Sequence, residues 1–184
     1  MSEQRNESEW LSFVRKGGYQ FKGKLNSDLK IICGKETVAC LISSRDDAKK
    51  TVTYDLVRSG NGSPAYRFIR TETALSGVDP ENDQEKFVWQ RLSSSFSELL
   101  TGSKWQCGQL LLSQNIVRSL MMWVPRISWF IPTKYTITDN GQCCGIVAGS
   151  ACSLSNGKSV TVGDPEKAWE IMAAAIILSE DEIG

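Results

Sequence analysis

The chain contains no histidine among its 184 residues. Histidine is the general base of Ser-His-Asp and Cys-His enzymes and a frequent zinc ligand. The sequence therefore excludes both catalytic arrangements and any metal site that needs imidazole. A chain of this length ordinarily has a few histidines available for acid–base chemistry, so their absence favours a non-enzymatic role.

Paired cysteine motifs are also missing. Six cysteines are present, but none has the C-x-x-C spacing of a zinc ribbon. The N-terminal stretch MSEQRNESEW lacks the apolar core of a signal peptide. We therefore expect reduced thiols in a cytoplasmic protein, peripheral to a membrane at most, and we predict no metal and no cofactor.

The vicinal pair Cys143-Cys144 follows a turn, and strand geometry predicts that one thiol points inward and the other outward. Both can be small hydrophobic side chains, and the alternative is a redox, acylated or metal-binding thiol.

A surplus of charge of either sign is absent, because 21 Lys and Arg balance 21 Asp and Glu. Nucleic-acid binding is not indicated, since a dedicated nucleic-acid binder usually carries a basic surplus. No glycine-rich phosphate loop occurs between a strand and a helix. The length fits an N-terminal tail with a short helix (1–18) followed by a single β-rich domain (19–184).

Alternating apolar residues and turn chemistry predict β-structure over most of the chain. Asp139-Asn140-Gly141 is a hairpin signal. Three segments share one layout of strand, glycine-containing turn and strand, namely 28–42, 53–69 and 134–147, which implies an antiparallel meander or barrel. The predicted strands are 29–33, 37–43, 50–57, 65–71, 105–113, 118–124, 126–131, 134–139, 142–149 and 159–163.

Two helices are predicted before the C-terminus. Asp79 and Pro80 resemble a helix N-cap and first position, and apolar residues recur at helical spacing, which predicts an amphipathic surface helix near 80–100. The segment SEWLSFVRKGG predicts a short helix capped by Ser8, with Trp10 and Phe13 on its apolar face. This face either packs on the body or binds a membrane or partner.

The segment from Asp164-Pro165 onward predicts a helix over 165–179. Such a helix is about 22 Å long, shorter than a bilayer core of about 30 Å. Beyond its first turn it is apolar on all sides apart from Glu170, so it should be buried on all sides. The predicted fold class is therefore α+β: a mostly antiparallel, barrel-like sheet enclosing a hydrophobic C-terminal helix, plus the surface helix.

This combination resembles the tubby C-terminal-like superfamily, which includes phospholipid scramblases and plant LURP-one-related proteins. The segment from Tyr135 to Ile146 is similar to the superfamily's Y-x-I-x-D-x-x-G-x-x-x-G-x-I hairpins, with one residue fewer between Asp139 and Gly141. The resemblance implies a barrel around a hydrophobic C-terminal helix. It also implies a ligand that is an anionic lipid headgroup or a protein partner at a membrane.

The candidate binding residues are of two kinds. Trp123 and Trp129 lie in the aromatic stretch 119–131, which is either core or an exposed membrane or partner patch. The others are the basic residues Arg45, Lys49, Lys50, Arg58, Arg67 and Arg70, which are either solvated or an anion site.

We therefore predict a binding module for anionic lipid or for a membrane-associated partner. One alternative is an interaction subunit of a larger assembly, using the Trp10/Phe13 helix or the Trp123–Phe130 stretch. An enzyme without histidine chemistry is disfavoured.

Overall fold

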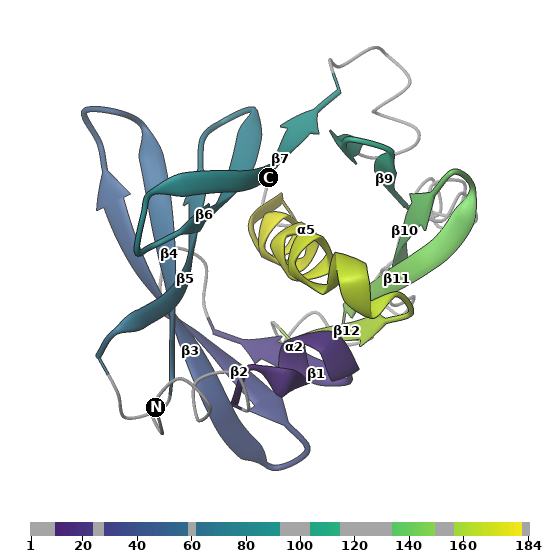
Figure 1. The fold of residues 1–184 in the computed structure, drawn as a ribbon, viewed down its shortest axis with the longest axis horizontal. Coiled ribbons are helices and arrows are strands. Elements are labelled where there is room, and N and C mark those ends of the chain that lie inside the picture. The colour runs from purple at the N-terminus through teal and green to yellow at the C-terminus, as the bar shows by residue number, and fades with distance from the viewer. Residues whose placement is uncertain are drawn as a thin grey trace, which may run out of the picture.

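The computed structural model describes residues 10–23, 28–58, 62–92, 104–114, 134–149 and 157–181. Within these ranges twelve strands pair antiparallel in chain order, and β1 pairs with β12 to close a barrel around the C-terminal helix (Figure 1). The strands are β1 Tyr19–Lys22, β2 Leu29–Cys33, β3 Glu36–Asp46, β4 Thr51–Arg58, β5 Pro64–Arg70, β6 Ala74–Asp79, β7 Gln84–Arg91, β8 Trp105–Cys107, β9 Leu110–Gln114, β10 Lys134–Asp139, β11 Gln142–Gly149 and β12 Lys158–Val162. The predicted barrel with an enclosed hydrophobic helix is confirmed.

The strands form because their apolar residues alternate with polar ones at the period of a β-strand. In β1, Tyr19 and Phe21 are buried while Gln20 and Lys22 are exposed. The three repeated segments are the hairpins β2–β3, β4–β5 and β10–β11, and each contains one register shift. Such β-bulges bend a strand and increase its twist, which helps a sheet to curve into a barrel.

The turn at Asp139-Asn140-Gly141 is confirmed as the connection between β10 and β11. Asn140 has φ 48° and Gly141 has φ 84°. Two successive residues with positive φ match the right-handed twist of the strands they join, which explains the Asn-Gly pair.

The C-terminal helix begins where the Asp-Pro pair predicts. Asp164 accepts a hydrogen bond of 3.0 Å from the backbone N–H of Glu166, and a 3-10 turn η2 (Pro165–Lys167) leads into α5 (Ala168–Asp181). All eight residues from Ile171 to Leu178 have 0% exposure. The helix therefore fills the barrel as a core element.

Two local contacts fix α5 against the wall. The indole N–H of Trp89 in β7 donates a 2.9 Å hydrogen bond to the backbone carbonyl of Glu170. On the opposite side, Gly145 of β11 faces Ile171, and a Cβ on Gly145 would lie 2.9 Å from the Ile171 Cδ1 atom. Glycine is therefore required here by the close approach of helix and strand rather than by backbone conformation.

The predicted surface helix near 80–100 is wrong where the structure describes it. Residues 84–91 form β7, which pairs with β6 along its length. Asp79 is not a helix cap: it accepts the N–H of Glu81 at 3.0 Å and begins a tight turn in which Asp83 has φ 52°. Trp89 points inward opposite Leu75, so the two-residue period of a strand prevails over the helical one. Residues 93–100 lie outside the described residues.

The structure describes the predicted N-terminal helix from Trp10 onward, and Trp10 is helical. Helix α2 spans Ser12–Lys16 and ends at Gly17, as expected, but its N-cap position is Leu11. Ser8, the predicted cap, lies outside the described residues. Phe13 is buried and packs edge-on against Tyr19 with ring centroids 5.5 Å apart, so this side chain belongs to the core.

The predicted strand 105–113 is two strands, because Gly108, with φ 56°, turns the chain between β8 and β9. The predicted strands 118–124 and 126–131 lie outside the described residues. None of the helices in the described ranges is both long enough and apolar enough to span a bilayer.

Replacing Ala174 with Asp tests the burial of α5. Ala174 has 0% exposure, so Ala174→Asp places an unpaired carboxylate in the core and should cost about 4 kcal/mol of unfolding free energy, measured by urea denaturation. Ala48 is exposed in the β3–β4 turn, and Ala48→Asp should change stability by less than about 0.5 kcal/mol. An Ala174→Asp midpoint equal to that of the wild type would mean that α5 is exposed.

The contact between Gly145 and Ile171 predicts a coupled pair of substitutions. Gly145→Ala should destabilise the protein by about 1–3 kcal/mol through overpacking. Because the clash is with the Ile171 side chain, adding Ile171→Val should recover part of that loss in a double-mutant cycle. A Cβ on Gly62 would have no atom within 4 Å, so Gly62→Ala is the control. Additive effects at 145 and 171 would contradict the contact.

Candidate binding surfaces

The two ends of the barrel differ in their connections. Because consecutive strands are antiparallel, successive connections alternate between the ends. We call one end the turn end: α5 begins there, and its connections include the short turns 34–35, 80–83, 108–109 and 140–141. We call the other the loop end, where the connections are 23–28, 47–50, 71–73, 92–104, 115–133 and 150–157.

The described residues at the loop end are predominantly basic. When each charged residue is assigned to the nearer end of its strand, turn or helix, ten basic and four acidic residues lie there; the mid-strand pair Asp55–Arg67 and the last turn of α5, with Glu180 and Asp181, are left out of this count. The basic ones are Lys22, Lys30, Arg45, Lys49, Lys50, Arg70, Arg91, Lys104, Lys134 and Lys158, and the acidic ones are Asp28, Asp46, Asp47 and Glu72.

The described residues at the turn end have the opposite balance, with nine acidic and six basic residues. The acidic ones are Glu36, Asp79, Glu81, Asp83, Glu85, Asp139, Asp164, Glu166 and Glu170, and the basic ones are Arg15, Lys16, Lys35, Arg58, Lys86 and Lys167. The overall charge of zero thus conceals a separation of charge along the barrel axis in the described part of the chain.

Three of the predicted basic residues lie together at the loop end, in and beside the β3–β4 turn. Arg45 pairs with Asp47 at 2.6 Å and Lys49 with Asp46 at 3.8 Å. These pairs are exposed, so water screens them and they contribute little to stability. Lys50 makes no ion pair with another described residue.

The other three predicted basic residues lie elsewhere. Arg58 is at the turn end. Arg67, on the outer face of β5, forms a two-point hydrogen bond with Asp55 at 2.7 and 3.3 Å, and this bond raises the pKa of the guanidinium. Arg70 is 8% exposed and lies inside, with its Cζ 4.7 Å from the centroid of the Trp105 ring. The six residues therefore do not form one site.

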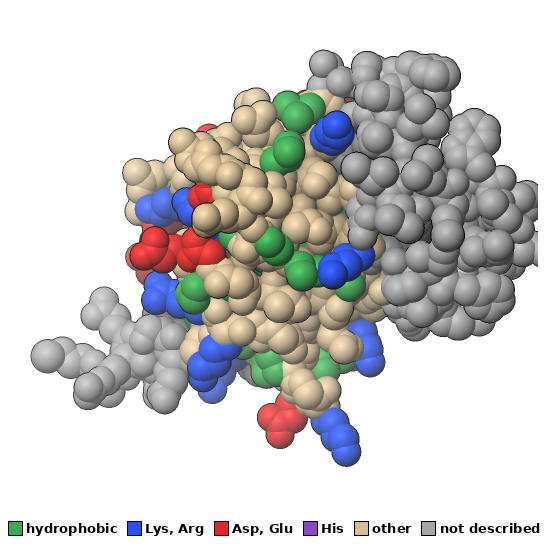
Figure 2. Space-filling model, turned by 90° about the vertical axis from the view of Figure 1, so that its right-hand side faces the viewer, with side chains coloured by type: hydrophobic (Ala, Val, Ile, Leu, Met, Phe, Trp, Pro, Cys, Tyr) green, Lys and Arg blue, Asp and Glu red, His purple; other side chains and the backbone are tan. Residues whose placement is uncertain are grey.

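Lys and Arg side chains also stand apart from one another on the face shown in Figure 2, where they lie around its edge with some Asp and Glu among them. Trp123 and Trp129 lie outside the described residues, so whether they are exposed stays a prediction. The strands beside their segment, β9 ending at Gln114 and β10 beginning at Lys134, have those ends at the loop end.

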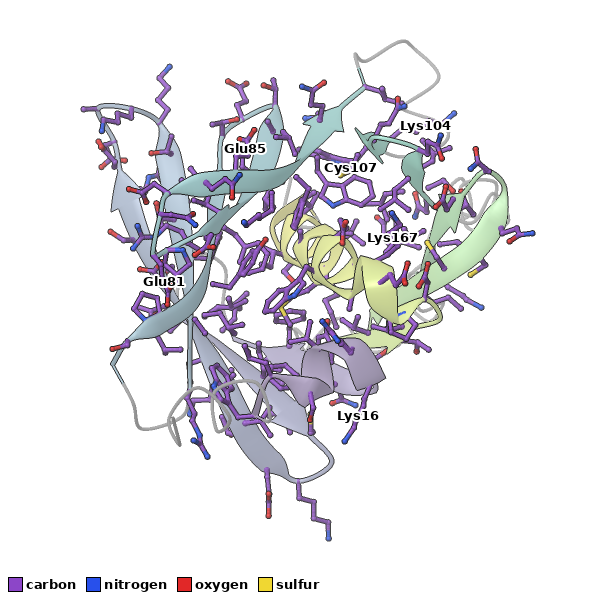
Figure 3. All side chains as sticks on the ribbon, in the orientation of Figure 1. Lys16, Glu81, Glu85, Lys104, Cys107 and Lys167 are labelled. Carbon is purple, nitrogen blue, oxygen red and sulfur yellow. The ribbon has the colours of Figure 1, made fainter. Side chains whose placement is uncertain are left out.

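The vicinal pair Cys143-Cys144 lies at the start of β11. Cys143 is exposed and Cys144 is buried, as the alternation predicts, and Cys144 donates to the carbonyl of Ile137 at 3.2 Å. Burial raises the pKa of Cys144, and it raises that of Cys107 to about 11. Figure 3 shows Cys107 on the wall of the barrel, facing α5. In the described ranges, no group of three or more Cys, Asp and Glu is placed to hold a metal ion.

An aromatic stack lies at the turn end beside the start of α5. Tyr66 stacks on Trp169 with ring centroids 4.2 Å apart and on Phe87 at 6.5 Å. Burial raises the pKa of Tyr66, and it also raises that of the neighbouring Glu170 carboxyl in the first turn of α5. A neutral Glu170 is therefore favoured by the folded state.

The turn end also has a cleft of about 560 Å³ between α2 and the adjoining strands. Its walls combine the apolar side chains of Trp10, Phe13 and Val38 with the charged side chains of Lys16, Glu36 and Arg58. Figure 3 shows Lys16 projecting from α2 at the edge of the barrel. Sequence reasoning missed this grouping, because it joins segments that are far apart along the chain.

Comparisons with known proteins identify no relative: no family model, no curated protein and no solved structure matches the chain.

The raised pKa of Glu170 predicts a pH-dependent gain in stability from Glu170→Gln. The folded state favours the neutral carboxyl. Its contribution to the free energy of unfolding is therefore fully present below the pKa of the unfolded chain, about 4.3, and is lost as the pH rises through the pKa of the folded protein. Glu170→Gln should therefore be more stable than wild type at pH 7, with the difference shrinking towards pH 4 in urea titrations.

Glu166→Gln is the matched control, because Glu166 is exposed one turn earlier. It should leave the unfolding free energy within about 0.5 kcal/mol of wild type. A Glu170→Gln variant that is less stable than wild type at pH 7 would contradict the burial of this carboxyl.

Proposed function

We propose that this protein is a non-enzymatic binding module that docks on anionic lipid surfaces with the loop end of its barrel. The observation that carries the proposal is the separation of charge along the barrel axis. An anionic surface attracts the basic end and repels the acidic end, so the charges select one orientation as well as supplying affinity.

The packed interior supports recognition at an end of the barrel. A barrel can hold a ligand in its lumen only where side chains leave space, and here α5 occupies the lumen with eight consecutive fully buried residues. A ligand at this level of the barrel would have to displace core side chains. Binding must therefore use an end or the outer wall.

Most of the basic residues at the loop end are accessible to an anionic membrane surface. Of the ten described there, only Arg70 and Lys158 are buried. Each accessible Lys or Arg contributes about 1 kcal/mol near an anionic membrane, and the four acidic residues offset about half of that total. The electrostatic attraction is therefore moderate and should weaken strongly with salt.

A second contribution to membrane affinity comes, under this proposal, from the aromatic stretch that contains Trp123 and Trp129. This stretch connects β9 and β10, whose ends at Gln114 and Lys134 lie at the loop end. Tryptophan rings favour the boundary between headgroups and acyl chains. Placed there, they would add salt-insensitive affinity to the basic residues.

The resemblance to the tubby C-terminal-like superfamily supports the same ligand class. We propose that the chain shares the ancestry of those barrels, since they too surround a hydrophobic C-terminal helix with antiparallel strands. The cytoplasmic leaflet of the plasma membrane is rich in anionic lipid. This ligand class therefore fits a cytoplasmic protein that is peripheral to the plasma membrane.

Vesicle sedimentation tests the proposal. The full chain should bind vesicles of phosphatidylcholine with about one-third phosphatidylserine, should bind pure phosphatidylcholine much less, and should dissociate in high salt. Lys49→Gln/Lys50→Gln removes two positive charges from the loop end and should weaken binding about 30-fold, as two lysines at about 1 kcal/mol each imply.

The control makes the same change of charge at the turn end. Arg15→Gln/Lys35→Gln also removes two exposed cations and should leave vesicle binding within about twofold, because those residues face away from the membrane. Equal losses for the two double variants would show that net charge, and not the loop end, governs binding. No binding to anionic vesicles at low salt would reject the proposal.

A further inference from the structure

The cleft at the turn end has the size and composition of a small-molecule site. Its volume of about 560 Å³ lies within the range of about 300–1,000 Å³ that is common for such sites. Helix α2 forms one wall, and the rim residues of β2, β3 and β4 form the other. The site is separate from the loop end, and the inference does not depend on the proposed function.

One part of the cleft is apolar and well supported. Phe13 is 7% exposed and is held by its edge-on contact with Tyr19, while Trp10 lies 6.3 Å from Phe13 between ring centroids. Val38 and Cys33 are half-buried on the opposing strands. Aromatic and aliphatic walls of this kind bind a flat or apolar body through burial of its surface.

The other part of the cleft is charged, and its charges are not neutralised by neighbours. Lys16, Glu36 and Arg58 line it, and none of the three makes an ion pair with another described residue. Two cations and one carboxylate leave a single positive charge. This balance complements one negative charge on a ligand, and a doubly charged group would be left with an uncompensated charge beside Glu36.

We propose that this cleft is a binding site for a small amphipathic monoanion, with an aromatic or aliphatic body against Trp10 and Phe13 and a carboxylate or sulfonate between Lys16 and Arg58. The arrangement lies at the acidic end of the barrel, where the surrounding field disfavours anions. Specific contacts with these two cations, and not general attraction, must therefore hold the ligand.

A pair of fluorescent probes with the same aromatic body tests the site on the full chain. Anilinonaphthalene sulfonate carries one negative charge, and phenylnaphthylamine carries none. Arg58→Gln should weaken sulfonate binding roughly fivefold, the upper end for an exposed ion pair, and should leave binding of the uncharged probe within about twofold. Glu36→Gln should act in the opposite direction and tighten sulfonate binding a few-fold.

The double variant Lys49→Gln/Lys50→Gln controls for probe bound at the basic loop end and should bind the sulfonate as the wild type does. Sulfonate binding that is absent, or that is unchanged by Arg58→Gln and Glu36→Gln, overturns the inference. Binding that falls in the loop-end variant and not in the cleft variants overturns it as well. Vesicle binding should be the same for Arg58→Gln and wild type, so the two proposals succeed or fail separately.

Discussion

The burial of α5 inside the closed sheet is the interaction on which the rest of the structure depends. A helix satisfies its own backbone hydrogen bonds internally, so it can occupy an apolar lumen without leaving polar groups unpaired. Its three consecutive alanines, Ala173 to Ala175, keep it narrow, and Gly145 lets the wall approach it closely. The inward-facing side chains of the strands pack against this helix and would otherwise surround an empty channel.

A filled barrel determines where function can be found. Since α5 fills the lumen, the described part of the chain leaves only the outer wall and the two ends of the barrel open to a ligand, and these ends differ in charge and in architecture. The loop end combines accessible cations with the connection that carries the predicted aromatic stretch. The turn end combines an acidic rim with a cleft whose charged residues, Lys16, Arg58 and Glu36, carry a net positive charge. This difference is why we propose a different ligand for each end.

The sequence predicts the fold better than the binding surfaces. Asp164 and the apolar run of α5 indicate a buried helix by local rules alone, and the hairpins follow from their turns. The error at 80–100 arose because an Asp-Pro pair begins either a helix or a tight turn, and only the pairing of Trp89 with Leu75 decides between them. That error, with the unrecognised turn at Gly108, also hides the charge separation, because assigning each connection to an end requires the correct number of strands.

Hydrogen exchange at the α5 amides tests the central claim most directly. If the helix is the element around which the barrel closes, it cannot open while the barrel stays folded. The amides from Met172 to Leu178 should then exchange only through global unfolding, with protection that matches the unfolding free energy from urea denaturation. If these amides exchange at a free energy well below that of global unfolding while the long strands β3 and β4 stay protected, the central claim is contradicted.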